Sequence, residues 1–361
     1  MANGRIYNFS AGPSMLPLEV LERAGKEITN YQGSGMSVME MSHRSKVFQK
    51  IFDDTKAKFK KLMAVPDDYE VLFLQGGAST QFSAIPLNLI GSTGKADYAV
   101  TGNFSNLAYQ EAKKYGDIAV ACTSEDQDFS YIPTQDKIVV RPDASYFYYC
   151  ANNPLYGTEW QYIPETGNVP IVCDMSSDIC SRQVDVSRYG VIYAGAQKNL
   201  APAGVTIVIV KKELAGHELP ITPKMLGWQI EIEKDSMYNT PPCWCIYMLG
   251  LVCDWLESQG GVAGMEKITH GKAQMLYAVI DDSRLFHCAA QPGSRSDMNV
   301  TFRTDSAELD AKFVAESAEW GFSNLKGHRK VGGMRASIYN AMPIEGVEKL
   351  CEFIKHFDQT N

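Results

Sequence analysis

The sequence predicts an α/β protein in which a mainly parallel sheet is flanked by helices and followed by a smaller α+β domain. Strand-like and helix-like segments alternate through much of the chain, as expected for parallel strands joined by helices. The length of 361 residues exceeds what one small core usually organises and indicates two domains. From about residue 262 the order of elements changes, which places the domain boundary there.

The N-terminal part of the chain begins as a loop at residues 8–13 and then shows two helical patterns. Pro17 is a favoured first-turn residue, and apolar residues recur at helical spacing after it. A loop at Gly33 and Gly35 separates this helix from a second amphipathic helix over residues 48–62.

Short apolar runs bounded by glycine, proline or polar residues predict the strands of the large domain. The run 71–74 breaks at Gly76-Gly77, and the segment from Gln81 is typical of a helix. Further strands are predicted at 98–100, 146–151, 169–174, from residue 191, and 205–210. An apolar helix over 244–256 stops at Gly260-Gly261, so we expect the large domain to span residues 16–261.

The remaining segments predict a small α+β domain over residues 262–361, joined by the N-terminal segment 1–15. A helix comes first, and the later elements alternate between strand and helix. The predicted order is strand 298–302, helix 307–320, strand 334–338 and a final amphipathic helix over about 346–357.

Composition favours a soluble cytosolic enzyme. The hydrophobic content is 45%, and the net charge of −8 argues against general binding to nucleic acid or anionic membranes. We find no apolar stretch long enough to span a bilayer and no signal-peptide pattern at the N-terminus. The nine cysteines are scattered, which predicts reduced thiols, and no cluster has the spacing of a metal site.

Asp174 and Lys198 are the most informative residues, because each closes or directly follows a strand-like run. If both strands lie in one sheet, the two side chains emerge at the rim where α/β proteins bind ligands. An amine and a carboxylate there suit pyridoxal phosphate: the lysine forms a Schiff base and the aspartate pairs with the protonated ring nitrogen. Taken singly, a lysine after a strand is usually a solvated charge and such an aspartate is often a turn or helix cap.

Other polar motifs carry weaker signals. The turn Gly76-Gly77-Ala78-Ser79 lies between a strand and a helix and could bind phosphate through helix-start amides. Two His-Arg pairs and Arg335 suggest an oxyanion site, although a single arginine is usually a surface charge. For Phe104 and the turn Asn239-Thr240, a packing or turn role is the simpler interpretation from pattern alone.

Together the motifs resemble those of the phosphoserine aminotransferases, class-V, fold-type I pyridoxal-phosphate enzymes of serine biosynthesis. The resemblance covers essentially the whole chain and rests on the segments 8–13, 37–44, 189–199, 236–242 and 327–341. It implies a seven-stranded sheet, a cytoplasmic homodimer with shared active sites, and no nucleic-acid or membrane partner. The implied reaction transfers the amino group of L-glutamate to 3-phosphohydroxypyruvate, giving O-phospho-L-serine and 2-oxoglutarate; 4-phosphohydroxythreonine of pyridoxine biosynthesis would fit the same anion pocket.

The resemblance also implies a role for each matching residue. Lys198 would carry the cofactor, Asp174 would hold its ring nitrogen protonated, and Phe104 would stack on the ring. Cofactor phosphate would be bound by Ala78, Ser79 and Gln197, together with Asn239 and Thr240 of the partner subunit. Arg335 would hold the substrate α-carboxylate. The substrate phosphate or the glutamate side chain would be held by His43 and Arg44 with His328 and Arg329 of the partner subunit.

Three residues depart from the family pattern. Phe104 stands where tryptophan is common, Pro154 stands where threonine is usual, and Ala201 replaces a glycine. Pro154 removes a hydroxyl contact to the cofactor.

Two rival functions stay open at this stage. A lyase or cysteine desulfurase on the same fold would need a reactive cysteine, with Cys180 and Cys243 as candidates. A cofactor-free binding or scaffold protein would use Lys198 only structurally.

Overall fold

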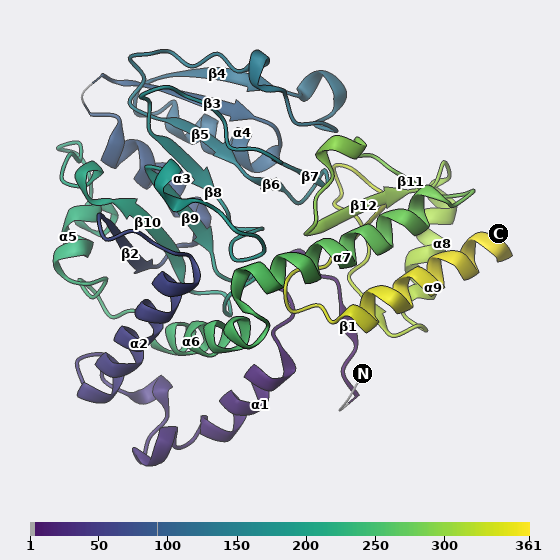
Figure 1. The fold of residues 1–361 in the computed structure, drawn as a ribbon, viewed down its shortest axis with the longest axis horizontal. Helices are drawn as coiled ribbons and strands as arrows, with labels where there is room; N and C mark the ends of the chain where they lie inside the picture. Colours follow the sequence, from purple (N-terminus) through teal and green to yellow (C-terminus); the bar gives the residue numbers. More distant parts are fainter. Residues whose placement is uncertain (1–3, 92) are drawn as a thin grey trace.

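The computed structural model describes residues 4–91 and 93–361 and contains a large α/β layer beside a smaller domain (Figure 1). The seven strands of the large sheet lie in the order β2-β10-β9-β8-β5-β3-β4. Only β10 runs against the others, because it pairs antiparallel with both β9 and β2. The strands are β2 Tyr69–Leu74, β3 Lys95–Val100, β4 Asp117–Thr123, β5 Phe147–Cys150, β8 Ile171–Asp174, β9 Val191–Gly195 and β10 Thr206–Lys211.

The predicted mainly parallel seven-stranded sheet is therefore confirmed. Strand β4 was not identified individually from the sequence. Its apolar run, residues 118–122, lies at the sheet edge and contains two alanines, which have a low strand propensity. Helix α3 begins at Gly77, earlier than the predicted Gln81. Its first turn consists of small residues that show no helical hydrophobic periodicity, so the sequence pattern did not indicate where the helix begins.

Helices cover both faces of this sheet (Figure 1). On one face, α3 and α4 pack on a core that includes the buried tyrosines of β3, β5 and β9. On the other face, α2 and α6 pack together over the apolar residues that alternate with those tyrosines. The helices of this domain are α1 Leu18–Glu27, α2 Lys46–Leu62, α3 Gly77–Leu89, α4 Asn103–Ala112, α5 Trp228–Glu233 and α6 Cys243–Ser258.

The C-terminal part of the chain builds a second core around the sheet β11-β12-β14. The chain's N-terminal segment joins this core, because Tyr7 and Phe9 are buried in it and β1 pairs with β13. On this basis we propose the division into 16–261 and 262–361 with segment 1–15, of which residues 1–3 lie outside the described part. The elements are β1 Tyr7–Asn8, α7 Gly261–Asp281, β11 His287–Cys288, β12 Asn299–Arg303, α8 Ala307–Ser317, β13 Phe322–Ser323, β14 Met334–Ser337 and α9 Ile344–Thr360.

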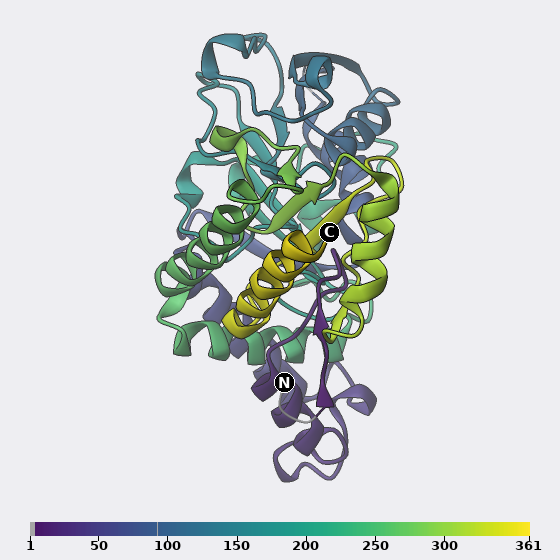
Figure 2. The same ribbon diagram turned by 90° about the vertical axis from the view of Figure 1, so that its right-hand side faces the viewer.

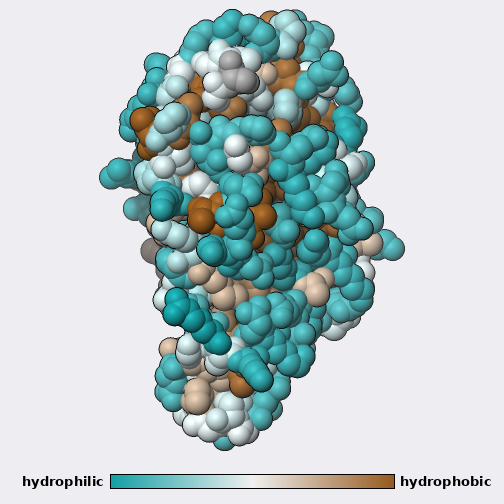
Figure 3. Space-filling view, turned by 90° about the vertical axis from the view of Figure 1, so that its left-hand side faces the viewer, coloured by the Kyte–Doolittle hydropathy of each residue, from teal (hydrophilic) through white to brown (hydrophobic). Residues whose placement is uncertain are grey.

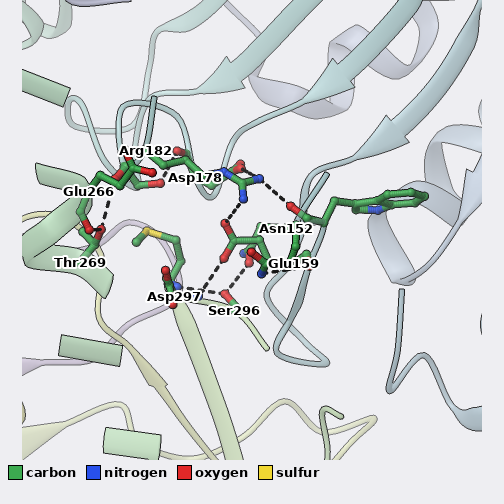
Figure 4. Close-up of polar contacts among 12 residues, drawn as sticks. Asn152, Glu159, Asp178, Arg182, Glu266, Thr269, Ser296 and Asp297 are labelled. Carbon is green, nitrogen blue, oxygen red and sulfur yellow. Dashed lines mark hydrogen bonds and ion pairs between the residues drawn. The ribbon is translucent and has the colours of Figure 1, made fainter. Parts of the chain in front are cut away.

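A buried polar cluster lies where the two parts meet (Figure 4). Arg182 forms ion pairs with Glu159 at 3.3 Å and with Asp178 at 3.5 Å. Glu159 ends the short hairpin of β6 Asn152–Asn153 and β7 Thr158–Glu159, and its carboxylate accepts the backbone N–H of Asp297 at 2.8 Å. The cluster thus joins the large domain to the strand β12 region through the charge-assisted hydrogen bond from Asp297 to Glu159.

The segment between the first helix and α2 projects from the body of the molecule (Figure 2). Large apolar side chains are exposed on this segment at Ile28, Met36 and Met39, and on α1 at Leu21. Two more, Ile221 and Met225, are exposed just before α5, and Figure 3 shows hydrophobic residues at the surface of the molecule's α5 side. None of the helices in the described ranges is long and apolar enough to cross a membrane.

Candidate active site

The carboxyl ends of β2, β3, β5, β8 and β9 meet at one rim of the sheet, and a cavity of about 430 Å³ opens there. This is the position that open α/β sheets use for ligands. The small domain closes one side of the cavity. Its lining includes Ala11, Gly12, Gly77, Ala78, Ser79, Phe104, Pro154, Asp174, Ser177, Gln197, Lys198, His328 and Arg335.

Lys198 lies three residues beyond the end of β9 and points its amine into this cavity. The Nζ atom donates a hydrogen bond to Ser177 Oγ at 2.8 Å and lies 5.6 Å from the centre of the Phe104 ring. Gly12 packs against the lysine stem, where a Cβ would lie 3.2 Å from Lys198 Cγ. The Ser14 hydroxyl donates to the Lys198 carbonyl. The N-terminal segment therefore fixes the lysine backbone and leaves its amine free to react.

Asp174 is the last residue of β8 and is almost fully buried. One carboxylate oxygen accepts the Ser176 backbone N–H at 2.8 Å, and the other accepts the Tyr193 hydroxyl at 2.9 Å. Hydrogen bonds to a carboxylate offset the cost of burying its charge. Asp174 and Lys198 thus line the same cavity at one rim of the sheet, as expected from the sequence; their roles stay predictions.

The first turn of α3 lines one wall of the cavity. Gly76 turns the chain into the helix with φ of +91°, and no side chain caps the helix start. The backbone N–H groups of the first turn, at Gly77, Ala78 and Ser79, are therefore available, and the helix dipole favours negative charge there. The Gln197 side chain lies at the same cavity and folds back over Gly195, where a Cβ would lie 2.8 Å from Gln197 Oε1.

Arg335, on β14, brings a positive charge to the opposite wall. Its Nη1 donates to the Pro154 carbonyl at 3.3 Å, and its buried Nε has no hydrogen-bond partner. No acidic side chain among the described residues lies within ion-pair distance of it, and burial lowers the pKa of the guanidinium. His328 lines the same cavity, and burial together with the charge of Arg335 lowers the pKa of its imidazole. An anionic ligand would satisfy this wall.

The cavity of one chain does not include every residue that the resemblance assigned to the site. His43 and Arg44 precede α2, Arg329 is exposed, and Asn239 and Thr240 follow α5, all outside the lining. His328, expected from the partner subunit, lines the cavity of its own chain. Sequence separation alone could not decide which chain supplies each residue.

Two residues of the site were missed in the sequence. The Ser177 hydroxyl accepts a hydrogen bond from the Lys198 amine, and the Tyr193 hydroxyl donates one to Asp174. Ser177 lies three residues beyond Asp174 in a polar turn. Because this turn follows a predicted strand, the sequence could have placed it at the rim of the sheet. Tyr193 gave no separate signal, because only the register of β8 and β9 places it beside Asp174.

The cysteines do not support a thiol mechanism. Cys180 and Cys243 lie outside the cavity lining, and burial raises the pKa of both thiols. Cys150 lines the cavity, but burial raises the pKa of its thiol well above the usual value, with Asp174 adding to this. A reactive cysteine is typically a thiolate in an electropositive, accessible site, which none of these provides. Within the described residues no group of His, Cys, Asp and Glu could hold a metal ion.

Comparison with known proteins agrees with this geometry. The family model for aminotransferase class V matches residues 6–350. A phosphoserine aminotransferase of Bacillus cereus is 50% identical over 357 residues, which cover 99% of each chain. A solved phosphoserine aminotransferase from Bacillus circulans is 45% identical, with a TM-score of 0.97 over 99% of each chain. A pyridoxal-phosphate-bound phosphoserine aminotransferase from Trichomonas vaginalis is 39% identical, with a TM-score of 0.94 over 97% of this chain and 100% of that one. The chain belongs to the class-V aminotransferase family and, within it, to the phosphoserine aminotransferases.

Proposed function

We propose that this enzyme uses pyridoxal phosphate to transfer the amino group of L-glutamate to 3-phosphohydroxypyruvate, with the site residues acting as follows. The observation that carries the proposal is the meeting of Lys198, Asp174 and the uncapped start of α3 in one cavity, opposite an unpaired Arg335. An amine, a carboxylate and an anion cradle are the groups that this cofactor requires.

The cavity's donor set fits the cofactor. Ala78, Ser79 and Gln197 would hold its phosphate, Phe104 would lie against its ring, and Asp174 would pair with the ring nitrogen. When bound, pyridoxal phosphate supplies an aldehyde that condenses with amines and a ring that accepts electrons from the substrate α-carbon.

Lys198 performs the proton transfers in this proposal. Its amine is held by a single side-chain hydrogen bond, to Ser177, so it can swing between that hydroxyl and the substrate α-carbon. With its amine free, Lys198 would act as the general base that removes the α-proton of glutamate, and as the general acid that returns a proton. The same groups run the second half-reaction in the reverse direction.

In this proposal, basic side chains of both subunits bind the substrate. Arg335 would hold the α-carboxylate, since its buried Nε is unpaired and faces no acidic side chain among the described residues. His328, next to it in the same chain, gains a proton most easily when an anion offsets the charge of Arg335. His43 and Arg44 would contact the phosphate or the glutamate side chain from the partner subunit, because they lie outside their own chain's cavity.

A homodimer is therefore part of the proposal. The projecting N-terminal segment and the segment before α5 expose large apolar side chains, and they adjoin the residues that the cavity lacks, Arg44 and Asn239. Burying such side chains in an interface is favourable. We also propose a cytoplasmic location, which the nine free cysteines support.

The test measures O-phosphoserine formation by the purified protein from glutamate and 3-phosphohydroxypyruvate. Arg44→Ala should raise the KM for the phosphorylated keto acid at least tenfold, since a charge-assisted hydrogen bond contributes roughly 1.5–3 kcal/mol. The KM for unphosphorylated 3-hydroxypyruvate should change much less. An unchanged KM for the phosphorylated substrate would remove Arg44 from the site, and no product formation by the parent protein would reject the reaction itself.

A further inference from the structure

A line of buried tyrosines leads to Asp174 from the α3 face of the sheet. Asp174 and Tyr193 are partners on the adjacent strands β8 and β9, so their side chains project on the same face. The Tyr193 hydroxyl donates to Asp174 at 2.9 Å, and the Tyr148 hydroxyl lies 2.8 Å from that of Tyr193. Tyr148 and Tyr193 are fully buried in the core beneath α3 and α4.

The direction of these hydrogen bonds follows from the number of protons. A phenol has one proton, and Tyr193 uses it on the carboxylate, which can only accept. Tyr148 must then donate to the oxygen of Tyr193. Burial raises the pKa of both phenols well above its usual value, so both remain donors. The Tyr98 ring stacks on Tyr148 with centres 4.6 Å apart and fixes that ring.

The carboxylate of Asp174 is thereby held by donors on both oxygens. The Ser176 backbone N–H engages one oxygen and Tyr193 engages the other. Hydrogen bonds in series polarise one another. The bond from Tyr148 to Tyr193 therefore strengthens the bond from Tyr193 to Asp174. A carboxylate with two fixed donors keeps both its charge and its orientation in a buried site, as the second ligand shell does around metal centres.

We propose that Tyr193, supported by Tyr148, is a positioning residue that holds the Asp174 carboxylate ionised and oriented toward the ring nitrogen of the cofactor. This inference rests on the proposed role of Asp174. It adds a specific consequence: removing the Tyr193 hydroxyl should weaken the binding of a ring that has a nitrogen more than the binding of a ring that lacks one.

The experiment titrates the cofactor-free full-length protein with pyridoxal phosphate and with its analogue in which carbon replaces the ring nitrogen. The ratio of the two Kd values reports the contact at the ring nitrogen and cancels general effects on the pocket. Tyr193→Phe should reduce the preference for the nitrogen ring about tenfold, the loss expected for one hydrogen bond to a charged group. Tyr148→Phe leaves the hydrogen bond from Tyr193 to Asp174 in place and should reduce the preference for the nitrogen ring about threefold.

Tyr146→Phe is the matched control. Its hydroxyl is equally buried and bonds to Tyr98 at 2.8 Å, without contact to Asp174. The control should lose stability to a similar extent but keep the Kd ratio of the parent. Asp174→Asn should abolish the preference.

The outcomes distinguish a failure of the role proposed for Tyr193 from a failure of the role proposed for Asp174. If Tyr193→Phe weakens both ligands equally while Asp174→Asn removes the preference, the tyrosine is structural and the inference is wrong. If Asp174→Asn also keeps the preference, the assignment of Asp174 fails instead. Should Tyr193→Phe not fold, an unchanged ratio in Tyr148→Phe overturns the inference.

Discussion

At the scale of single residues, the site is made of side chains whose partners are incomplete without a ligand. Arg335 keeps an unpaired Nε, and Lys198 has only a serine hydroxyl as its side-chain partner. Buried polar groups in proteins are normally satisfied, so such residues mark the place where a ligand completes the network. The buried Lys272, by contrast, has hydrogen-bond partners within the fold.

Lys272 is a buried basic residue whose hydrogen bonds stabilise the fold and do not contribute to the site. It is fully buried in α7, and its amine donates to the carbonyls of Ile338, Tyr339 and Met342 at 2.8–3.1 Å and to that of Asn340 at 3.4 Å. These carbonyls belong to the turn that follows β14. Lys272→Met would leave them without a donor, so we expect the free energy of unfolding to fall by about 3 kcal/mol or more. Urea denaturation measures this, and the exposed Lys267→Met on the same helix should change it by less than about 0.5 kcal/mol.

At the scale of secondary structure, the parallel strands β2, β3, β5, β8 and β9 place cavity-lining residues at or just beyond their carboxyl ends. The strand β8 ends on Asp174, β9 leads to Lys198, and β2 leads into the α3 start. Parallel strands align these ends at one rim, which makes the site a property of the sheet. The antiparallel β10 contributes no residue to the cavity lining, since its carboxyl end points to the other rim.

The start of α3 offers a test at this scale. Gly76 has φ of +91°, and a Cβ there would overlap the Thr80 side chain at 2.1 Å. Gly76→Ala should distort the first turn and raise the Kd for pyridoxal phosphate about tenfold or more, while pyridoxal, which lacks the phosphate, is affected less. Titration of the cofactor-free protein gives both constants. Gly167→Ala carries the same backbone strain in open space and should leave the ratio of the two constants unchanged.

At the scale of the whole molecule, two junctions organise the protein: the contact between its domains and the proposed contact between subunits. The first contains the half-buried Arg182 with the buried Glu159 and Asp178 (Figure 4). Burial raises the pKa of Asp178 to about 7, with Glu159 and Asp174 adding to the effect and Arg182 opposing it. The folded state therefore keeps a proton that the unfolded chain releases above its ordinary pKa of 3.8.

This proton makes stability depend on pH in a defined direction. Because the folded state binds more protons between about pH 4 and pH 7, the contribution of Asp178 to stability falls as pH rises through that window. Asp178→Asn has no such proton, so its stability relative to the parent should increase from pH 4 to pH 7 and then level off. Thermal or urea unfolding across this range measures it. The exposed Asp282→Asn should show no trend, and a flat difference for Asp178→Asn would contradict the prediction.

The proposed subunit contact can be tested by mixing an inactive Lys198→Ala chain with an Arg44→Ala chain and measuring activity at a concentration of the phosphorylated keto acid far below the KM of Arg44→Ala. If Arg44 serves the partner's cavity, a dimer of one Lys198→Ala chain and one Arg44→Ala chain has one site with both residues intact. Random co-assembly should then restore activity in about a quarter of all sites. If Arg44 acts within its own chain, no mixed site is complete and activity stays at the level of the separate variants.

The sequence by itself determined the fold class, the order of most elements and the location of Asp174 and Lys198 at one rim of the sheet. These follow from local information: apolar runs of strand length, helical periodicity, and ionisable residues placed at the ends of strands. The family could also be inferred, because its motifs are contiguous in the chain. The edge strand β4 and the true start of α3 were harder to identify, since the alanines of β4 and the small residues at the start of α3 carry weak strand and helix signals.

Only the tertiary structure decided which distant residues meet. The register of β8 and β9 places Tyr193 on Asp174, and the packing of the small domain brings Arg335 and His328 into the cavity of their own chain. It also leaves Arg44 and Asn239 outside that cavity. Such contacts depend on strand order, register and domain docking, which are set by the burial of whole faces and not by any short stretch of sequence.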